Sequence, residues 1–553
     1  MTLEALTDRF WNAALAHAPT FATVIGVHDF DDQLTPLDET SLEQTAATFA
    51  AVTDEAEAID DSTLTTQQRI TRELLIYSSR TRLSDIERRF NVAPIDPYLG
   101  PHTRLLNDTR QNTVADSGQA DALLHRYERI PTYLEEAISL QRLNAEEGMT
   151  PAMASLERVF SQLDGYLTSS IDTDPFLALD VPGDGEKWHA KAEALVASVI
   201  RPAFEEYRAQ LQEHLAPVAR PDEKSGLMWI TNGDQIYRDL VYKYTQLDKT
   251  PEEIHEIGLE WATEINAKEW VEIGRQAFGL STIEEIFERL HSDPDLRFRT
   301  ADEMVEHAER ALERAWGVVD DWFGTRPTTP CTVKPVPEAM APAMPPAYYM
   351  SPPLDGSRPG TYFINTYKPE ERDLFEYESI HFHEGIPGHH FDRSLAAELE
   401  GLPPFRRYAM VYAHTEGWGL YSERLADEMG LYSSDIDRLG MISADAWRAG
   451  RLVTDTGIHA MGWSRQQAID FLQKWTPIGL LTIEQEVDRY IGMSGQALSY
   501  KMGQLEIMRL RQESEKNLGD RFDIKGFHDT MLIHGAMPLP LLGQVVQEWE
   551  NSI

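Results

Sequence analysis

The sequence His381-Phe-His-Glu-Gly-Ile-Pro-Gly-His-His390 holds four of the chain's 17 histidines within ten residues. A glutamate, Glu384, directly follows the second of these histidines. Imidazoles and carboxylates are the side-chain groups that bind zinc and similar ions. The alternative explanation is a set of solvated or core histidines without a metal. We therefore predict a metal site at this stretch and expect the rest of the chain to be organised around it.

The spacing of these histidines differs from the usual zinc-peptidase motif. That motif is His-Glu-x-x-His on a helix, where residues four apart share a face and the glutamate faces the metal-bound water. Here the histidines after His383 and Glu384 are His389 and His390, at offsets of six and seven. On a continuous helix an offset of seven spans about 10.5 Å, too far for two imidazoles to share an ion with bonds of about 2 Å. The helix must therefore be interrupted, and the Gly-Ile-Pro-Gly segment 385–388 can break it.

A third ligand is expected from a carboxylate on a following helix. Glu416 and Glu423 are seven residues apart in the helical segment 405–429, on one face but two turns distant. Both can line the site, but only one can readily reach the ion. Gly417 and Gly419 in the same segment each cost about 1 kcal/mol relative to alanine, which favours close packing against the helix that carries the histidines.

A polar stripe follows on a segment otherwise rich in Ala, Leu, Val and Trp. Arg448, Arg451, Asp455 and His459 recur there at helical spacing. Two interpretations are open. In one, the stripe is an exposed face with an Arg451–Asp455 pair worth a few tenths of a kcal/mol. In the other, it lines the site, and an arginine binds a substrate carboxylate through two parallel hydrogen bonds.

The composition predicts a soluble globular protein. The 553 residues are 42% hydrophobic and 25% charged, and the length allows several domains or one bilobed body. The net charge of -41 is spread along the chain and argues against nucleic acid or an anionic membrane as a partner. The single cysteine, Cys331, excludes an intramolecular disulfide and a thiolate metal cage. We expect a cytoplasmic protein, because neither a signal peptide nor a run of about 18 apolar residues is recognisable. A monomer or a homodimer is expected.

Helix signals dominate the chain on both sides of a proline-rich segment. Start signals of the Ser/Thr-x-x-Glu type before residue 325 are Thr40 with Glu43, Thr250 with Glu253, Thr282 with Glu285, and Thr300 with Glu303. Nine prolines in the segment 325–353 exclude continuous helix there, and the valines and tyrosines between them favour short strands at a sheet edge. The segment 360–366 is one more predicted strand. We therefore predict a helical scaffold lobe over 1–325 and a catalytic lobe over 326–553, which together can form one continuous unit.

Two stretches, His383-Glu-Gly-Ile-Pro-Gly-His-His390 and Glu416-Gly-Trp-Gly-Leu-Tyr-Ser-Glu423, resemble a bacterial family called domain of unknown function 885, or DUF885. Further similar stretches extend the resemblance over essentially the whole chain. The family is grouped with the zincin-like metallopeptidases, and its distant relatives are carboxypeptidase Taq, thimet-type oligopeptidases and angiotensin-converting enzyme. The resemblance implies a mostly α, bilobed helical clamshell with a small β-sheet next to the active-site helix, and zinc chemistry of the gluzincin type. It does not specify a substrate.

The resemblance also implies roles for the motif residues. Relatives with His-Glu-x-Gly-His align their Gly-His pair with His389 and the glycine before it, which makes His389 the second ligand. His390 is then an alternative ligand or a residue near the substrate. The resemblance favours Glu416 as the third ligand and leaves Glu423 or His414 to orient a ligand imidazole.

A tyrosine or histidine on a late helix of the clamshell relatives stabilises the oxyanion that forms when water attacks the substrate carbonyl. Tyr500 matches that position best, Tyr490 is the alternative, and a core tyrosine is the structural explanation for either. The residues expected to bind substrate are Arg448, Arg451, His459, Gln496, Tyr362 and Asn365. The strand at 362–366 is expected to pair with the substrate backbone through its edge.

Taken together, the sequence predicts a zinc-dependent peptidase for short peptides or related small amides. One zinc ion bound by His383, His389 and Glu416 would activate water, and Glu384 would act as general base and then as proton donor. Two other classes remain open. The same ligands describe the facial triad of iron oxygenases, although such sites leave no role for Glu384. The interrupted motif also fits a non-catalytic helical binding protein with a degenerate metal site.

Overall fold

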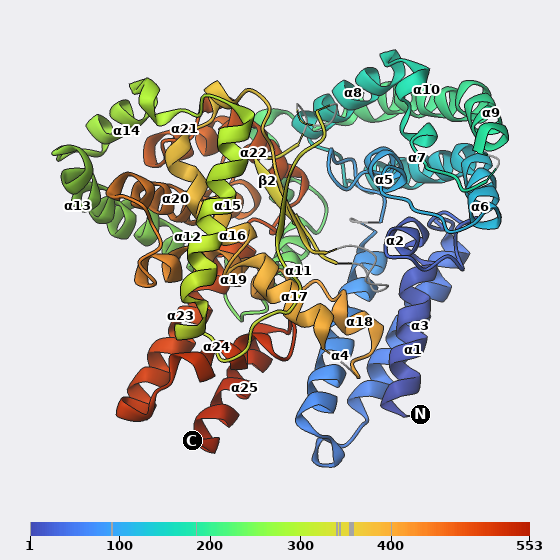
Figure 1. Cartoon of the computed structure of the whole chain (residues 1–553). Coiled ribbons are helices and arrows are strands. Elements are labelled where there is room, and N and C mark those ends of the chain that lie inside the picture. Colours follow the sequence, from blue (N-terminus) through green and yellow to red (C-terminus); the bar gives the residue numbers. More distant parts are fainter. Residues whose placement is uncertain are drawn as a thin grey trace. The chain divides into compact units, whose positions relative to one another are not determined.

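The computed structural model describes residues 2–89, 92–183, 185–338, 341, 344–352, 359–399 and 401–553. Within them the protein is mostly α-helical with a small three-stranded sheet, which confirms the predicted mostly α fold (Figure 1). Two prolines of the proline-rich segment, Pro342 and Pro353, lie outside the described residues. The chain forms two compact units, which are described separately below. The clamshell arrangement stays a prediction.

The first compact unit comprises Met1–Tyr237, Ile458–Gln466 and Gln485–Ser494. Neighbouring helices in it bury apolar faces against each other, as Phe49 and Val52 of α3 show. Its complete helices are α1 (Leu3–Ala16), α2 (Pro19–Val24), α3 (Glu39–Glu57), α4 (Thr66–Arg88), α5 (Pro101–Thr109), α6 (Ser117–Glu128), α7 (Ile130–Glu146), α8 (Met153–Thr168), α9 (Gly185–Leu195) and α10 (Arg201–Gln210).

The second compact unit comprises Arg238–Gly457, Gln467–Glu484 and Gly495–Ile553. Its complete helices are α12 (Pro251–Glu260), α13 (Asn266–Phe278), α14 (Ile283–Ser292), α15 (Ala301–Val318), α16 (Tyr377–Glu384), α17 (His389–Glu398), α18 (Pro404–Arg407), α19 (Tyr412–Glu428), α23 (Leu498–Leu518), α24 (Ile524–Leu532) and α25 (Leu539–Ser552). Helices with residues in both units are α11 (Gly233–Thr245), α20 (Asp435–Ala460), α21 (Arg465–Trp475) and α22 (Leu480–Gly492).

The main unit boundary differs from the division predicted at residue 325. The first unit ends at Tyr237, and helices α12 to α15 belong to the second. The physical reason is packing, because α15 lies against α16, the helix that carries the first part of the histidine motif. The sequence boundary was placed at a change of composition, which marks the sheet rather than the edge of a packed core. The scaffold and catalytic roles given to the two halves stay predictions.

The sheet has the strand order β1-β3-β2. β1 (Thr332–Pro335) pairs parallel with β3 (Thr361–Ile364), and β2 (Ala347–Met350) pairs antiparallel with β3. Pro335 thus lies on an edge strand, where a missing N–H is tolerated, as predicted. β2 contacts α16, which confirms a small sheet next to the motif helix.

The predicted edge pairing of a substrate with the strand at 362–366 is wrong. β3 is the central strand, and its residues pair with β1 on one side and with β2 on the other. The backbone donors and acceptors of a central strand are used by its two neighbours, so β3 has no free edge for a peptide.

Most of the predicted helix starts are confirmed. Thr250, Thr282 and Thr300 are N-cap residues whose side chains accept a hydrogen bond from the backbone N–H three residues later. The expected start at Thr40 is wrong, because α3 begins earlier. Asp38 caps it by accepting from the N–H of Ser41, and a carboxylate is a strong cap.

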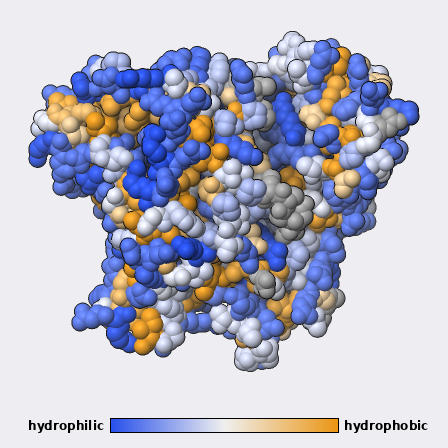
Figure 2. Space-filling view, in the orientation of Figure 1, coloured by the Kyte–Doolittle hydropathy of each residue, from blue (hydrophilic) through white to orange (hydrophobic). Residues whose placement is uncertain are grey.

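Hydrophilic residues predominate on the face of the molecule in Figure 2, and hydrophobic residues occur there as small separate groups. No helix in the described part of the chain combines the length and the apolar character needed to cross a membrane.

Candidate metal centre

The histidine motif spans two helices. α16 ends and α17 begins on either side of the segment 385–388, so the predicted interruption is confirmed. A side chain at Gly388 would collide with the backbone oxygens of Phe382 and His383, which explains why glycine stands there. The break brings His389 back to its partner, with the ring centroids of His383 and His389 only 4.7 Å apart.

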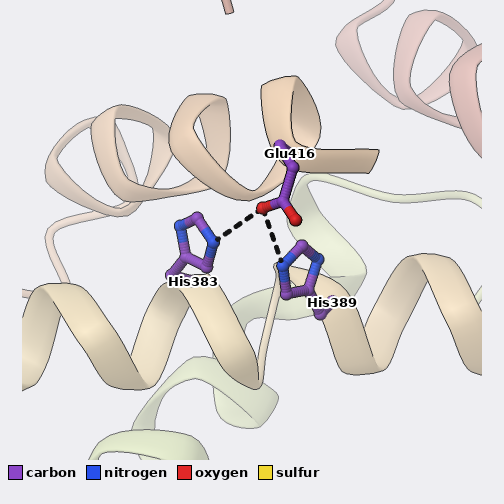
Figure 3. Close-up of side chains that lie close together, drawn as sticks. All are labelled: His383, His389 and Glu416. Carbon is purple, nitrogen blue, oxygen red and sulfur yellow. Dashed lines mark ion pairs between the residues drawn. The ribbon is translucent and has the colours of Figure 1, made fainter. Parts of the chain in front are cut away.

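His383, His389 and Glu416 point toward one another from α16, α17 and α19 (Figure 3). The Oε2 atom of Glu416 lies 3.6 Å from Nε2 of His383 and 3.4 Å from Nε2 of His389. Ligands bound at 2.0–2.2 Å to a tetrahedral zinc ion are themselves about 3.4 Å apart. The Glu416 oxygen therefore lies at the spacing from each histidine nitrogen that two ligands of one zinc ion have. His383, His389 and Glu416 are here called the metal triad, and their ligand atoms all lie within 4.8 Å of one another.

The metal triad is mostly buried but keeps some exposure to solvent. The side chains of His383, His389 and Glu416 are 5%, 13% and 16% exposed. Structural zinc sites have four protein ligands, whereas catalytic sites have three and leave one position for water or substrate. The donor set and its partial exposure both fit the second kind of site.

Glu423 supports the triad from behind His383. It is buried, and one of its carboxylate oxygens accepts a hydrogen bond from Nδ1 of His383 at 2.7 Å. The other oxygen accepts from the Ser379 hydroxyl. Such a carboxylate fixes the tautomer and orientation of a ligand imidazole. Glu423 thus occupies the orienting position that the sequence left open between Glu423 and His414. Ser379 was missed, although it lies one helical turn before His383.

Charge couples the members of this cluster. Burial disfavours the charged form of His383, but the carboxylates of Glu416 and Glu423 outweigh burial and raise its pKa to about 9. Burial also disfavours ionised Glu416, yet His383 and His389 hold the pKa of its carboxyl well below its usual range. Without a metal, a proton on His383 therefore stabilises the cluster.

The other two candidate histidines lie apart from the triad's ligand atoms. The Nδ1 atom of the buried His390 lies 3.1 Å from the Tyr349 hydroxyl and 3.3 Å from the Ser394 hydroxyl. Burial lowers the pKa of His390 to about 4. His414 is also buried, and neither of its ring nitrogens has a hydrogen-bond partner among the described residues. The geometry thus places His389, not His390, beside Glu416.

Tyr500 is the late-helix tyrosine that the structure brings to the triad. Its ring stacks on the imidazole of His383, with 6.5 Å between centroids and 25° between planes. The Arg451 guanidinium lies 4.5 Å from the centroid of the Tyr500 ring. Tyr490, the alternative, is buried in the first compact unit and donates its hydroxyl to Glu486 at 2.9 Å.

In the polar stripe on α20, Arg448 is half-buried and Arg451, Asp455 and His459 are buried, so its interpretation as an exposed face is wrong. The stripe lies on a helix packed on several sides, which its polar residue types do not reveal. Arg448 places Nη2 at 4.0 Å from Oε1 of Glu423. Arg451 lies 4.5 Å from the Trp447 ring as well as against Tyr500. The two arginines therefore belong to the surroundings of the triad.

Three residues predicted to bind substrate are held by internal hydrogen bonds instead. His459 accepts from the N–H of Leu227 through Nδ1 and donates from Nε2 to a backbone carbonyl. The Asn365 amide donates to two backbone carbonyls, and its oxygen accepts from a backbone N–H. The Tyr362 hydroxyl lies 2.7 Å from Nδ1 of His381. Their contacts do not support substrate binding. The sequence could not reveal this, because a buried polar side chain and a substrate-facing one have the same residue types and spacing. Gln496 is buried, and its role stays a prediction.

Glycines set the distance between the helices of the site. A Cβ atom at Gly419 would lie 2.7 Å from Cε1 of His383, so the predicted close packing of α19 on α16 is confirmed there. Gly417 differs from the prediction, because its added Cβ would meet the backbone of Gly503 on α23 at 2.5 Å. The two glycines thus allow α19 to pack closely against two different helices.

Replacing Gly419 by alanine is expected to destabilise the protein by about 1–3 kcal/mol and to reduce its zinc content, because the new methyl group displaces His383. Gly317→Ala on α15 is the matched control, since no atom lies within 4 Å of its added Cβ. It should stabilise by about 0.5–1 kcal/mol. Denaturant unfolding and metal analysis of both variants check this. A Gly419→Ala protein with wild-type stability and zinc content would contradict it.

Comparison with known proteins agrees with the resemblance drawn from the motifs. The chain is similar to the crystal structure of a candidate lipoprotein from Colwellia psychrerythraea, with 24% identity, a TM-score of 0.91, and coverage of 100% of this chain and 99% of that one. A candidate lipoprotein of unknown function from Shewanella oneidensis is similar at 19% identity and a TM-score of 0.78, covering 99% and 100%. These likenesses concern the fold alone. No curated protein matches the sequence. The model of the family described as "Bacterial protein of unknown function (DUF885)" matches residues 19–546, and the chain therefore belongs to the DUF885 family.

Proposed function

We propose that the protein is a zinc-dependent hydrolase, and that it acts as a peptidase on short peptides or related small amides. The observation that carries this proposal is the spacing of 3.6 Å and 3.4 Å between the Glu416 oxygen and the two histidine nitrogens. Two neutral imidazoles, one carboxylate and an open position are the donor set of a catalytic zinc site. The orienting contact from Glu423 to His383 supports the same conclusion.

Glu384 is the proposed general base. It directly follows the ligand His383 at the end of α16. Its negative charge contributes to the raised pKa values of both His383 and Tyr362. When bound, zinc would supply a polarised substrate carbonyl and an acidified water. The Glu384 carboxylate would accept a proton from that water and then deliver it to the leaving amine.

Tyr500 is proposed to stabilise the oxyanion. Its ring centroid lies 6.5 Å from that of the His383 imidazole and 4.5 Å from the guanidinium of Arg451, so Tyr500 lies beside the triad. A hydroxyl donor aimed at the developing negative charge is worth most when it is positioned in advance. Arg448 and Arg451 are proposed to bind a carboxylate of the substrate.

A peptide-library digest tests this function. Purified protein is incubated with a mixture of short peptides, with and without a chelator, and new termini are identified by mass spectrometry. We expect cleavage that stops with the chelator and returns with zinc. Zinc-loaded protein that cleaves no peptide in the library would contradict the peptidase, and oxygen-dependent turnover with iron would point to an oxygenase.

Zinc binding to the metal-free protein is expected to depend steeply on pH. Without metal, the pKa of His383 is about 9, above the ordinary value of 6.5. His383 is therefore mostly protonated between pH 6.5 and pH 9. Because zinc needs the neutral imidazole, affinity should rise by about tenfold per pH unit as the pH approaches about 9 and level off above. The same raised pKa stabilises the metal-free fold below pH 6.5, and this stabilisation is lost as the pH rises through 9. Competition titrations with a chelator check the slope, and an affinity independent of pH would contradict it.

A further inference from the structure

A second group of potential metal ligands lies outside the metal triad. His307 on α15, Glu378 on α16 and Asp437 on α20 each place one ligand atom within 4.8 Å of those of the other two. All three residues belong to the second compact unit. We propose that this group binds a second divalent transition-metal ion, separate from the zinc of the triad. The proposal rests on these residues and does not require the proposed peptidase activity.

Glu378 retains one free position for a cation. Its Oε1 atom accepts hydrogen bonds from Arg314 and from the Ser433 hydroxyl, and its Oε2 accepts from the Ser433 N–H at 2.8 Å. A carboxylate offers about four lone-pair positions, so these three bonds leave one on Oε2. The carboxylate is also held rigidly, as a metal ligand should be.

Asp437 and His307 complete the donor set. Asp437 is only 6% exposed, and its carboxylate accepts a hydrogen bond from the Ser434 hydroxyl at 2.7 Å. The Nδ1 atom of His307 lies 3.0 Å from Nε2 of His381, which leaves Nε2 of His307 for a metal. One imidazole nitrogen with two carboxylates suits zinc, manganese, cobalt or nickel. Calcium and magnesium prefer sites made of oxygen alone.

The charges around the group favour a cation. Arg314 pairs with Glu378, but no ion pair to Asp437 occurs within 4.0 Å among the described residues. Burial and the negative charge of Glu378 raise the pKa of Asp437 to about 6. Of these two buried carboxylates, only that of Glu378 has an arginine partner within 4.0 Å among the described residues. A divalent ion would offset the remaining negative charge.

The position of the group suggests what the ion would do. It would join α15, α16 and α20 close to the start of the helix that carries His383. Through His307 it would also fix the hydrogen bonds that run from His307 to His381 and on to Tyr362, because a metal on Nε2 leaves the proton on Nδ1. We therefore expect the ion to stabilise the support of the triad.

Metal stoichiometry after loading tests the proposal. The full chain is incubated with excess zinc or, separately, manganese, freed of unbound metal by gel filtration, and analysed for metal per chain. We expect two ions in the wild type, one in Asp437→Asn, one in His383→Ala and none in the double variant. Asp435→Asn is the matched control, because it removes the same charge from the same helix outside the group, and it should keep two.

The outcomes separate this proposal from the proposed function. If His383→Ala retains one ion that Asp437→Asn lacks, the second site stands whether or not the protein hydrolyses peptides. Equal metal content in the wild type and Asp437→Asn, or equal loss in Asp435→Asn, would overturn it and indicate adventitious binding. Circular dichroism verifies folding, and His307→Gln replaces Asp437→Asn if the latter does not fold. It should lose the same single ion.

Discussion

Glu384→Gln is expected to lower the rate of peptide hydrolysis by about 10²–10⁴-fold while the protein keeps its zinc, since this is the usual contribution of general acid–base catalysis. Glutamine preserves the shape of the side chain but cannot accept the proton of the attacking water. Glu384 ends α16 and is not part of the metal triad, so removal of its charge leaves the three ligands in place. This variant is therefore expected to lose activity but to keep its metal content.

The control for this variant is Glu370→Gln. Glu370 is an exposed carboxylate shortly before the same helix, so the substitution makes the same change of charge away from the site. It should leave activity within about twofold of the wild type, as surface substitutions usually have small effects. Steady-state rates of the wild type and both variants are compared on one library peptide that the wild type cleaves. Full activity in Glu384→Gln would contradict the mechanism and favour a function without this general base.

Glu416→Gln and Glu423→Gln are expected to weaken zinc binding by different amounts. Glu423 acts through His383, and loss of such an orienting partner typically costs about 10–100-fold in metal affinity. Glu416 contributes a ligand atom itself, so its replacement by a neutral amide should cost more than this. Both variants are isosteric with the wild type, which keeps the comparison fair.

Zinc affinity of the two variants is measured by competition with a chelator of known affinity. The expected order is wild type, then Glu423→Gln, then Glu416→Gln. The reverse order of the two variants would mean that Glu423 is the ligand and that Glu416 serves another purpose. Wild-type affinity in both variants would mean that neither carboxylate contributes to zinc binding.

The sequence predicted the break in the motif helix better than it predicted what surrounds it. Offsets of six and seven between histidines cannot be reconciled with one straight helix, so the interruption at 385–388 follows from helix geometry. The choice between Glu416 and Glu423 did not follow, because both lie on one helix face. The structure distinguishes them, because Glu416 lies beside Nε2 of both histidines whereas Glu423 contacts Nδ1 of His383.

Other parts of the site depend on contacts between distant segments. The segment 360–366 was predicted as a strand, but its central place between β1 and β2 depends on pairing that no local pattern specifies. His459 has the spacing of a site residue, yet both of its ring nitrogens bond to backbone groups. His307 lies in an ordinary amphipathic run, and its neighbours Glu378 and Asp437 are distant in sequence. Residue type and periodicity identify buried faces, but not which polar groups meet across them.

Anomalous X-ray diffraction at the zinc absorption edge tests the central claim most directly. Crystals of zinc-loaded protein should show a peak about 2.0–2.2 Å from Nε2 of His383, Nε2 of His389 and one oxygen of Glu416, in tetrahedral geometry with one position free. A His383→Ala crystal grown in the same way should lack that peak. The absence of a zinc peak at the metal triad in fully loaded wild-type protein, or a peak bound by His390 instead of His389, would contradict the account.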